Sequence, residues 1–160
     1  MRAADFERLF SEHAKPLFAF LAYRCGDRGL AEDVLADTFE RALRARTRFD
    51  RRKASEKTWL YTIALNLLRD QARRRTSEAR ALERYPHERT EPPDELAQVE
   101  RRDEVQSALG TLNDEEREAI ALRFGADLTV PEIARLLDEP LPRVEGRVYR
   151  SLRKLRQEFD

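Results

Sequence analysis

Apolar residues recur every three or four positions along most of this chain, and that spacing restricts the folds open to it. Trp59, Ile63 and Leu67 lie on one such line. A repeat near 3.6 residues predicts amphipathic helices, whereas a half-buried strand needs alternating apolar and polar residues. No segment alternates for long enough to predict a strand, and glycine, a poor helix former, occurs only five times. The sequence therefore predicts an all-α protein.

Three helices are predicted in the first half. Their apolar stripes run from Phe6 to Leu21, from Leu30 to Leu43 and from Trp59 to Leu68. Pro16 interrupts the first stripe and is a candidate for a kink. Residues 25–29 have the composition of a turn, and a polar, basic loop over 47–57 precedes the third helix. Ser55 or Thr58 is expected to cap that helix.

A proline-bearing, acidic stretch follows the third helix. Residues 76–94 contain Pro86, Pro92 and Pro93 and few apolar side chains. This composition favours a linker. We therefore predict two small helical domains joined by a flexible linker, with the first domain at 1–76, the linker at 77–98 and the second domain at 99–160.

Helix signals return after the linker. The apolar pattern resumes at Glu95 with Leu96 and Val99. Asn113 and Glu116 predict a capping box for a helix that runs to about residue 124, with Gly125 as its C-terminal cap.

The last 32 residues contain a helix-turn-helix pattern. Thr129 and Glu132 form a second capping box that opens a short helix, and residues 138–140 predict a turn. Pro142 suits the first turn of the final, longer helix. A short helix, a tight turn and a basic helix are typical of a module that places its second helix in the major groove of DNA.

The final helix is predicted to have two faces. The inward stripe consists of Val144, Val148, Leu152 and Leu155, and the basic stripe of Arg143, Arg147, Arg150 and Lys154. Arg143, Arg147 and Lys154 each directly precede a residue of the inward stripe, so the two stripes lie about 100° apart round the helix. Arginine can bind guanine edges or phosphates, and the sequence leaves open which side chain does which.

The net charge of zero hides an uneven distribution. Residues 1–75 contain 17 basic and 11 acidic side chains, and residues 143–156 contain six basic side chains against one acidic. Local basic patches on a neutral protein favour a polyanionic partner bound at defined places. The alternative is that these arginine-rich faces are simply solvated helix surfaces.

Composition also excludes several classes of protein. The longest uncharged run, residues 58–68, is too short to span a membrane, and the N-terminus lacks the apolar core of a signal peptide. One cysteine, Cys25, and two histidines provide too few groups for a metal site or an internal disulfide. No catalytic triad, paired carboxylates or glycine-rich phosphate loop is present. We expect a cytoplasmic protein that is not an enzyme and has no metal or other cofactor.

Residues 50–75 form a second candidate site. A basic loop leads into a helix that carries Trp59, Tyr61 and Asn66 and then four arginines. Aromatic and amide groups beside cations suit unstacked bases of single-stranded nucleic acid. For Trp59, packing in the core is the preferred interpretation. The segment 31–39 begins an acidic amphipathic helix that, taken alone, is a solvated face.

Together these segments resemble extracytoplasmic-function sigma factors of bacterial RNA polymerase. The resemblance rests on the order of AEDVLADTF, TWLYTIALNLLRDQARRR, the acidic linker, ALGTLNDEEREAIALR, LTVPEIARLL and RVEGRVYRSLRKLR. It implies a region-two domain that binds core RNA polymerase and the −10 promoter element, and a region-four domain that binds the −35 element.

The resemblance also implies roles for individual residues. Those expected at the polymerase are Asp33, Asp37, Phe39, Glu40 and Arg41. Those expected at the −10 element are Arg51, Arg52, Lys53, Lys57, Tyr61, Asn66, Arg69, Arg73 and Arg74. Those expected at the −35 element are Arg143, Glu145, Arg147, Tyr149, Arg150 and Lys154.

Several positions depart from the family pattern. Ala36 and Asp37 stand where the family often has glutamine and glutamate, and Asp138 stands where glycine is common in the turn. Glu145 and Gly146 interrupt the usual start of the recognition helix. A carboxylate at 145 could favour cytosine N4 over guanine, so these departures bear on the promoter sequence.

Two other functions remain open from the residues alone. One is a regulator that binds duplex DNA through its tail and uses its first domain for dimerisation or ligand sensing. The other is an interaction protein whose acidic and apolar faces bind a protein partner. A further hypothesis is control by an inhibitory protein, an anti-sigma factor, that clamps both domains. For Cys25, a small buried side chain is favoured over a redox sensor.

Overall fold

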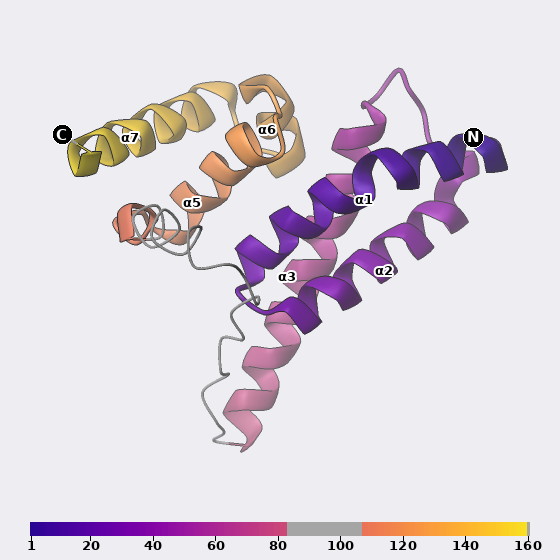
Figure 1. Cartoon of the computed structure of the whole chain (residues 1–160), viewed down its shortest axis with the longest axis horizontal. Coiled ribbons are helices and arrows are strands. Elements are labelled where there is room, and N and C mark those ends of the chain that lie inside the picture. Colours follow the sequence, from indigo (N-terminus) through magenta and orange to yellow (C-terminus); the bar gives the residue numbers. More distant parts are fainter. Residues whose placement is uncertain (83–106, 160) are drawn as a thin grey trace, which may run out of the picture. The chain divides into compact units, whose positions relative to one another are not determined.

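The computed structural model describes residues 1–82 and 107–159, and all regular structure in these ranges is helical (Figure 1). The chain divides into two compact units, Met1–Glu91 and Pro92–Asp160. The prediction of an all-α protein with two helical domains is confirmed.

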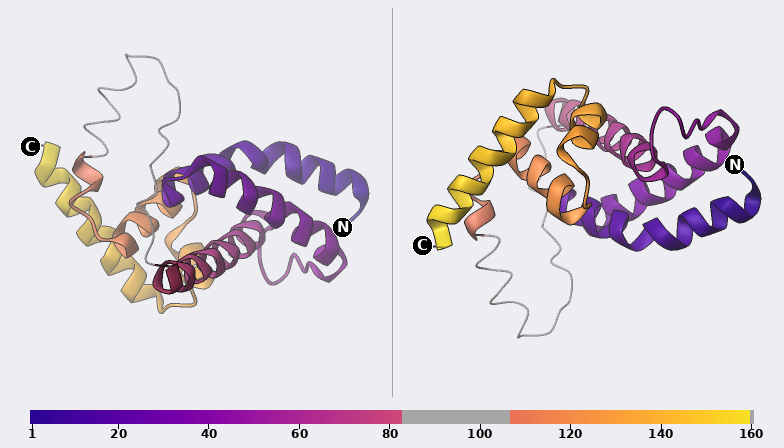
Figure 2. Two further views of the ribbon diagram at one scale, coloured as in Figure 1. Left: turned by 90° about the horizontal axis from the view of Figure 1, so that it is seen from below. Right: turned by 90° about the horizontal axis from the view of Figure 1, so that it is seen from above.

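The first unit is a bundle of three helices. Its elements are α1 (Ala3–Cys25), α2 (Arg28–Ala45), the short 3₁₀ helix η1 (Arg46–Arg48) and α3 (Glu56–Leu82). α1 and α2 run antiparallel, and α3 packs against both (Figures 1 and 2). This arrangement leaves the loop between η1 and α3 at one end of the bundle.

The turn between α1 and α2 is built from local signals. Gly26 ends α1 with a φ of 66°, a conformation that glycine adopts without strain. Asp27 caps α2, its side chain accepting the Leu30 N–H at 3.2 Å. The predicted turn is therefore confirmed.

α1 continues through Pro16, whose side chain is exposed.

The core of the first unit consists mainly of leucines from all three helices. Leu17, Leu21 and Leu60 are fully buried. Leu43, predicted to face inward, is instead 42% exposed. Ala42, also predicted to face inward, is fully buried, and the next residue lies about 100° further round the helix and so leaves the core.

α3 is longer than the sequence predicted. It continues to Leu82, so residues 77–82, which were expected in the linker, are helical. The remainder of the predicted linker, with its prolines, lies outside the described residues. The apolar residues Leu96 and Val99 also lie outside them.

The second unit contains the predicted helix-turn-helix. Its elements are α5 (Asp114–Ile120), the π-helical turn η2 (Ala121–Gly125), α6 (Val130–Leu137) and α7 (Leu141–Phe159). Both predicted capping boxes form, at Asn113 with Glu116 and at Thr129 with Glu132. α7 packs against α5 and α6. Asp138 ends α6 with a φ of 54°, which explains why glycine suits this turn.

The buried face of α7 differs from the predicted stripe. It consists of Val144, Arg147, Val148 and Ser151, whereas Leu152 is 41% exposed. From Val144 to Val148 to Leu152 the predicted stripe takes two successive steps of four residues, and each such step turns the side chain by about 40° away from the core. A spacing of three and four keeps to one face, so Ser151 replaces Leu152 there. Its hydroxyl donates to the carbonyl of Arg147 at 2.7 Å.

Candidate nucleic-acid interface

The basic loop before α3 is held by three local contacts. The ring of Phe49 packs on Trp59, with centroids 4.8 Å apart. The Asp50 side chain accepts the Arg52 N–H at 2.9 Å, and Ser55 caps α3 by accepting the Thr58 N–H at 3.1 Å. Because Trp59 is half-buried, its indole anchors this loop.

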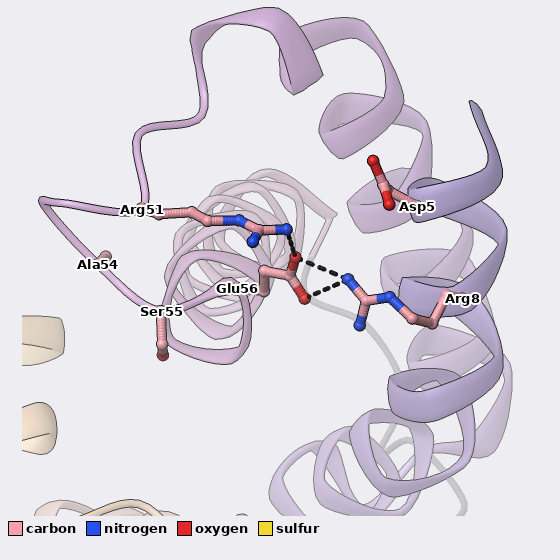
Figure 3. A pocket seen from close by; sticks show the side chains of 6 residues that line it. All are labelled: Asp5, Arg8, Arg51, Ala54, Ser55 and Glu56. Atoms are coloured by element: carbon pink, nitrogen blue, oxygen red, sulfur yellow. Dashed lines mark hydrogen bonds and ion pairs between the residues drawn. The ribbon is translucent and has the colours of Figure 1, made fainter. Parts of the chain in front are cut away.

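A carboxylate at the start of α3 joins the loop to α1. Glu56 accepts two hydrogen bonds from Arg8, at 2.8 and 3.0 Å, and one from Arg51 at 3.2 Å (Figure 3). The hydrogen bonds from Arg8, first to Glu56 and then to Glu12, raise the pKa of the Arg8 guanidinium. Glu56 itself also suits the first turn of a helix, where a negative charge is favourable. No spacing pattern in the sequence predicts this contact, because Arg8 and Glu56 are 48 positions apart.

Most of the cations expected at the −10 element face solvent. The exposed residues are Arg51, Arg52, Lys53, Asn66, Arg69, Arg73 and Arg74, and Lys57 is half-buried. The basic surface of the first unit consists of these exposed cations, which lie in the loop and along α3. Arg51 forms an ion pair with Glu56 at 3.2 Å.

Tyr61 does not lie on this basic surface. Its side chain is fully buried, and its ring packs on Phe20 with centroids 5.3 Å apart. The hydroxyl is buried and has no hydrogen-bond partner among the described residues. Tyr61, like Leu60 before it, is part of the core. The expectation that Tyr61 contacts an unstacked base therefore does not fit this structure.

Burial raises the pKa of Tyr61 to about 12. An unfolded tyrosine ionises near pH 10. The folded state therefore retains its proton more strongly, and the associated stability is complete below pH 10 and is lost as the pH rises towards 12. Y61F removes both this loss and an unsatisfied hydroxyl, so we expect it to raise the free energy of unfolding at pH 7 by about 1 kcal/mol.

Denaturant titrations of the unmodified protein and of Y61F at pH 7 and at pH 11 measure this effect. The difference between their free energies of unfolding should be larger at pH 11. Binding of single-stranded DNA at pH 7 is the control. A large loss of DNA binding in Y61F, with the fold intact, would contradict the placement of Tyr61 in the core.

The residues expected at the polymerase lie on α2. Asp33, Glu40 and Arg41 are exposed and Asp37 is half-buried. Phe39 is only 6% exposed, because its ring packs edge-on against two rings of α1, Phe6 and Phe10. Phe39 is therefore part of the core beneath the exposed residues of α2. Phe10, one of the two rings that it contacts, is 48% exposed.

The second unit has a polar hollow beside α7. Its lining residues are Asn113, Glu115, Glu116, Glu139, Arg143, Arg147, Arg150 and Lys154. The basic stripe predicted from the sequence thus meets three carboxylates that were not predicted to lie near it. Capping patterns identified Glu116, but its second partner is 38 residues away.

Two of the four stripe cations are paired with these carboxylates. Arg147, expected to be exposed, is buried, and its guanidinium lies 2.7 Å from Glu139 and 3.7 Å from Glu115. The Lys154 ammonium donates to Glu116 at 2.9 Å. This hydrogen bond, more than any other contact, lowers the pKa of Glu116.

The exposed residues of α7 include Arg143, Glu145, Tyr149, Arg150 and Lys154, all of which were expected at the −35 element. Among the described residues, neither Arg143 nor Arg150 has a side-chain hydrogen bond or ion pair. A Cβ added at Gly146 would lie 3.0 Å from Nη1 of Arg150. The absence of a side chain at 146 therefore leaves room for the Arg150 guanidinium against the helix.

Within residues 1–82 and 107–159, no group of three or more histidine, cysteine or acidic side chains is arranged to hold a metal ion. No helix in these ranges is both long enough and apolar enough to cross a membrane.

Each of the two units matches the model of a known protein family. The model of Sigma-70 region 2 matches residues 9–78, and the model of Sigma-70, region 4 matches residues 108–157. The fold and the basic faces therefore define a protein of the sigma-70 class.

Curated relatives specify the family further. SigX of Bacillus subtilis, an ECF RNA polymerase sigma factor, is 31% identical over 97% of this chain and 84% of its own. BldN of Streptomyces coelicolor, also an ECF sigma factor, is 30% identical over 96% of this chain, which spans 60% of the length of BldN. The chain belongs to the ECF RNA polymerase sigma factors, and the resemblance inferred from its sequence is confirmed.

Solved structures agree on the fold. The sigma factor RpoE of Bartonella quintana, in complex with the anti-sigma factor NepR, superposes with a TM-score of 0.82 at 24% identity over 97% of this chain and 96% of RpoE. CnrH, in complex with the cytosolic domain of CnrY, gives a TM-score of 0.70 at 28% identity over 99% of this chain and 90% of CnrH.

Proposed function

We propose that this chain binds core RNA polymerase and directs it to promoters of one sequence class. The observation that supports this most strongly is that α7, the second helix of the helix-turn-helix, presents the exposed cations Arg143 and Arg150 on a separate unit from the basic loop. Two separate basic faces suit a promoter with two separate elements. We assign residues 1–76, extended by the helical residues 77–82, to the polymerase and the −10 element, the rest of 77–98 to a linker and 99–160 to the −35 element.

The −10 element would meet the loop and the exposed face of α3. Arg52 and Lys53 are exposed in the loop. Asn66 is exposed on α3, and the exposed arginines Arg69, Arg73 and Arg74 follow it along the same helix. Cations there would bind the backbone of the separated strand, with Asn66 as a polar contact to a base. Melting costs about 1.4 kcal/mol per base-pair step, which contacts to unstacked bases offset.

The −35 duplex would meet the exposed residues of α7. Arg143 and Arg150 are placed to bind guanine edges or phosphates, and Glu145 can accept a hydrogen bond from cytosine N4. Tyr149 is 67% exposed and offers an apolar surface to a thymine methyl group. Lys154, which is paired with Glu116, would contribute less than its charge suggests.

The polymerase would meet the exposed acidic face of α2, with Asp33, Asp37, Glu40 and Arg41 as the contact residues. Phosphodiester chemistry would belong to the polymerase, so the chain itself is not an enzyme and works in the cytoplasm without a cofactor. Because RpoE and CnrH are described in complexes with an anti-sigma factor and with CnrY, an inhibitory protein partner is proposed here too.

Reconstituted transcription tests the proposal. The chain is added to purified bacterial core polymerase with a library of genomic fragments, and transcripts are sequenced. We expect new transcripts with a shared pair of upstream elements, which core polymerase alone does not give. Binding of duplex DNA without any transcripts would favour a conventional regulator, and the absence of salt-dependent DNA binding would favour a protein-interaction role.

A further inference from the structure

The basic stripe of α7 consists of two kinds of cation. Arg143 and Arg150 are exposed and without ion pairs in the described residues, whereas the side chain of Arg147 is only 9% exposed. Sequence spacing places all of them on one face, so only the contacts of the folded unit separate them.

The partner of Arg147 lies in the turn of the helix-turn-helix. Glu139 is in the turn between α6, which ends at Leu137, and α7, which begins at Leu141. The Arg147 guanidinium lies 2.7 Å from the Glu139 carboxylate, whose side chain is 26% exposed. Glu115 on α5 adds a second, longer contact at 3.7 Å. One guanidinium therefore connects the recognition helix, the turn before it and the helix against which it packs.

This connection is an ion pair and not a hydrogen bond, because Glu139 Oε2 is buried and accepts no hydrogen bond among the described residues. Its contribution is the attraction between two charges held close together away from water. A buried charge that loses its partner is strongly unfavourable, so moving Arg147 from Glu139 to a phosphate carries a large free-energy penalty. Loss of the pair would free α7 to shift relative to α6, although the apolar contacts of Val144 and Val148 would still hold the helix in the unit.

We propose that Arg147 is a positioning residue that fixes the recognition helix on the helix-turn-helix turn through Glu139, and that Arg143 and Arg150 make the direct contacts with DNA. The assignment deepens the proposed function and rests on it where DNA is concerned. The positioning itself is a property of the second unit and can be measured without DNA.

Distance measurement between spin labels tests the positioning. In the full chain carrying C25S, labels are attached at the exposed positions R135C on α6 and Q157C on α7. We expect R147M to broaden the distance distribution while helicity by circular dichroism is unchanged. R147K should restore part of the sharpness, and E139Q should reproduce the broadening. An unchanged distribution in both R147M and E139Q would overturn the proposal.

Binding of an arbitrary duplex over a range of salt concentrations tests the second half. R150M is the matched control, since it removes a cation of the same type three residues further along α7. We expect R150M to lower the slope of log affinity against log salt by about 0.9, as for one lost phosphate contact. R147M should weaken binding without changing that slope.

An equal loss of slope in R147M and R150M would make Arg147 a phosphate contact and overturn the assignment. If the unmodified chain binds no DNA, the proposed function fails. The spin-label distances then still decide whether Arg147 positions α7, so the two failures are distinguishable.

Discussion

Neutralising the tip of the basic loop with R52Q and K53Q together should cause the largest loss of function. Both side chains are exposed, so the double change should leave the core intact. Each phosphate contact to a single strand contributes about 0.7 to the salt dependence of binding. Loss of two should lower the slope by about 1.4 and the affinity at 0.15 M salt by about tenfold. Fluorescence anisotropy with a labelled single strand measures both quantities.

Arg28 provides a matched control for this experiment. It is an exposed cation at the first residue of α2, at the other end of that helix from the loop. R28Q should leave the slope nearly unchanged. If R28Q and the loop variant lose the same affinity, binding depends on the overall charge of the first unit, and the assignment of the loop is wrong.

I133A should have the largest effect on stability. Ile133 is fully buried at the centre of α6. Truncation of a buried isoleucine to alanine costs about 2–5 kcal/mol, through lost burial and the cavity that remains. A unit of this size is stable by only a few kcal/mol, so the helix-turn-helix should be largely unfolded at 37 °C. Thermal unfolding followed by circular dichroism measures the change.

L152A is the control for I133A and also tests the corrected face of α7. Leu152 is 41% exposed, so its truncation should change the free energy of unfolding by less than about 0.5 kcal/mol. Trp59, the single tryptophan, lies in the first unit, and its fluorescence transition should be unaffected by either change. A loss in L152A as large as that in I133A would restore Leu152 to the core.

Local features of this fold could be predicted from the sequence because their causes are local. A capping box requires two residues three positions apart, and both predicted boxes, at Asn113 and Thr129, are confirmed. The turn at Gly26 and the start of α3 after Ser55 depend likewise on neighbours in the chain. Helix content followed from the apolar period, which does not depend on tertiary contacts.

The candidate site was predictable only in outline. Charge and helix patterns selected the basic loop and α7, but exposure depends on small rotations of each helix. A shift of one residue, about 100°, separates Ser151 from Leu152 and Ala42 from Leu43. Arg147 pairs with Glu139, which lies in the turn before α7, only once the turn and α7 have packed together. No rule of sequence spacing predicts this contact.

One carboxylate of the second unit has two tasks. Oε1 of Glu116 accepts the backbone N–H of Asn113 at 3.2 Å, which closes the capping box of α5, and also accepts the Lys154 ammonium at 2.9 Å. A descendant that lost this carboxylate would need a new cap and a new counter-ion at the same time. Substitutions at 113, 116 and 154 should therefore be inherited as sets, and an alignment of closely related chains should show these three positions changing together.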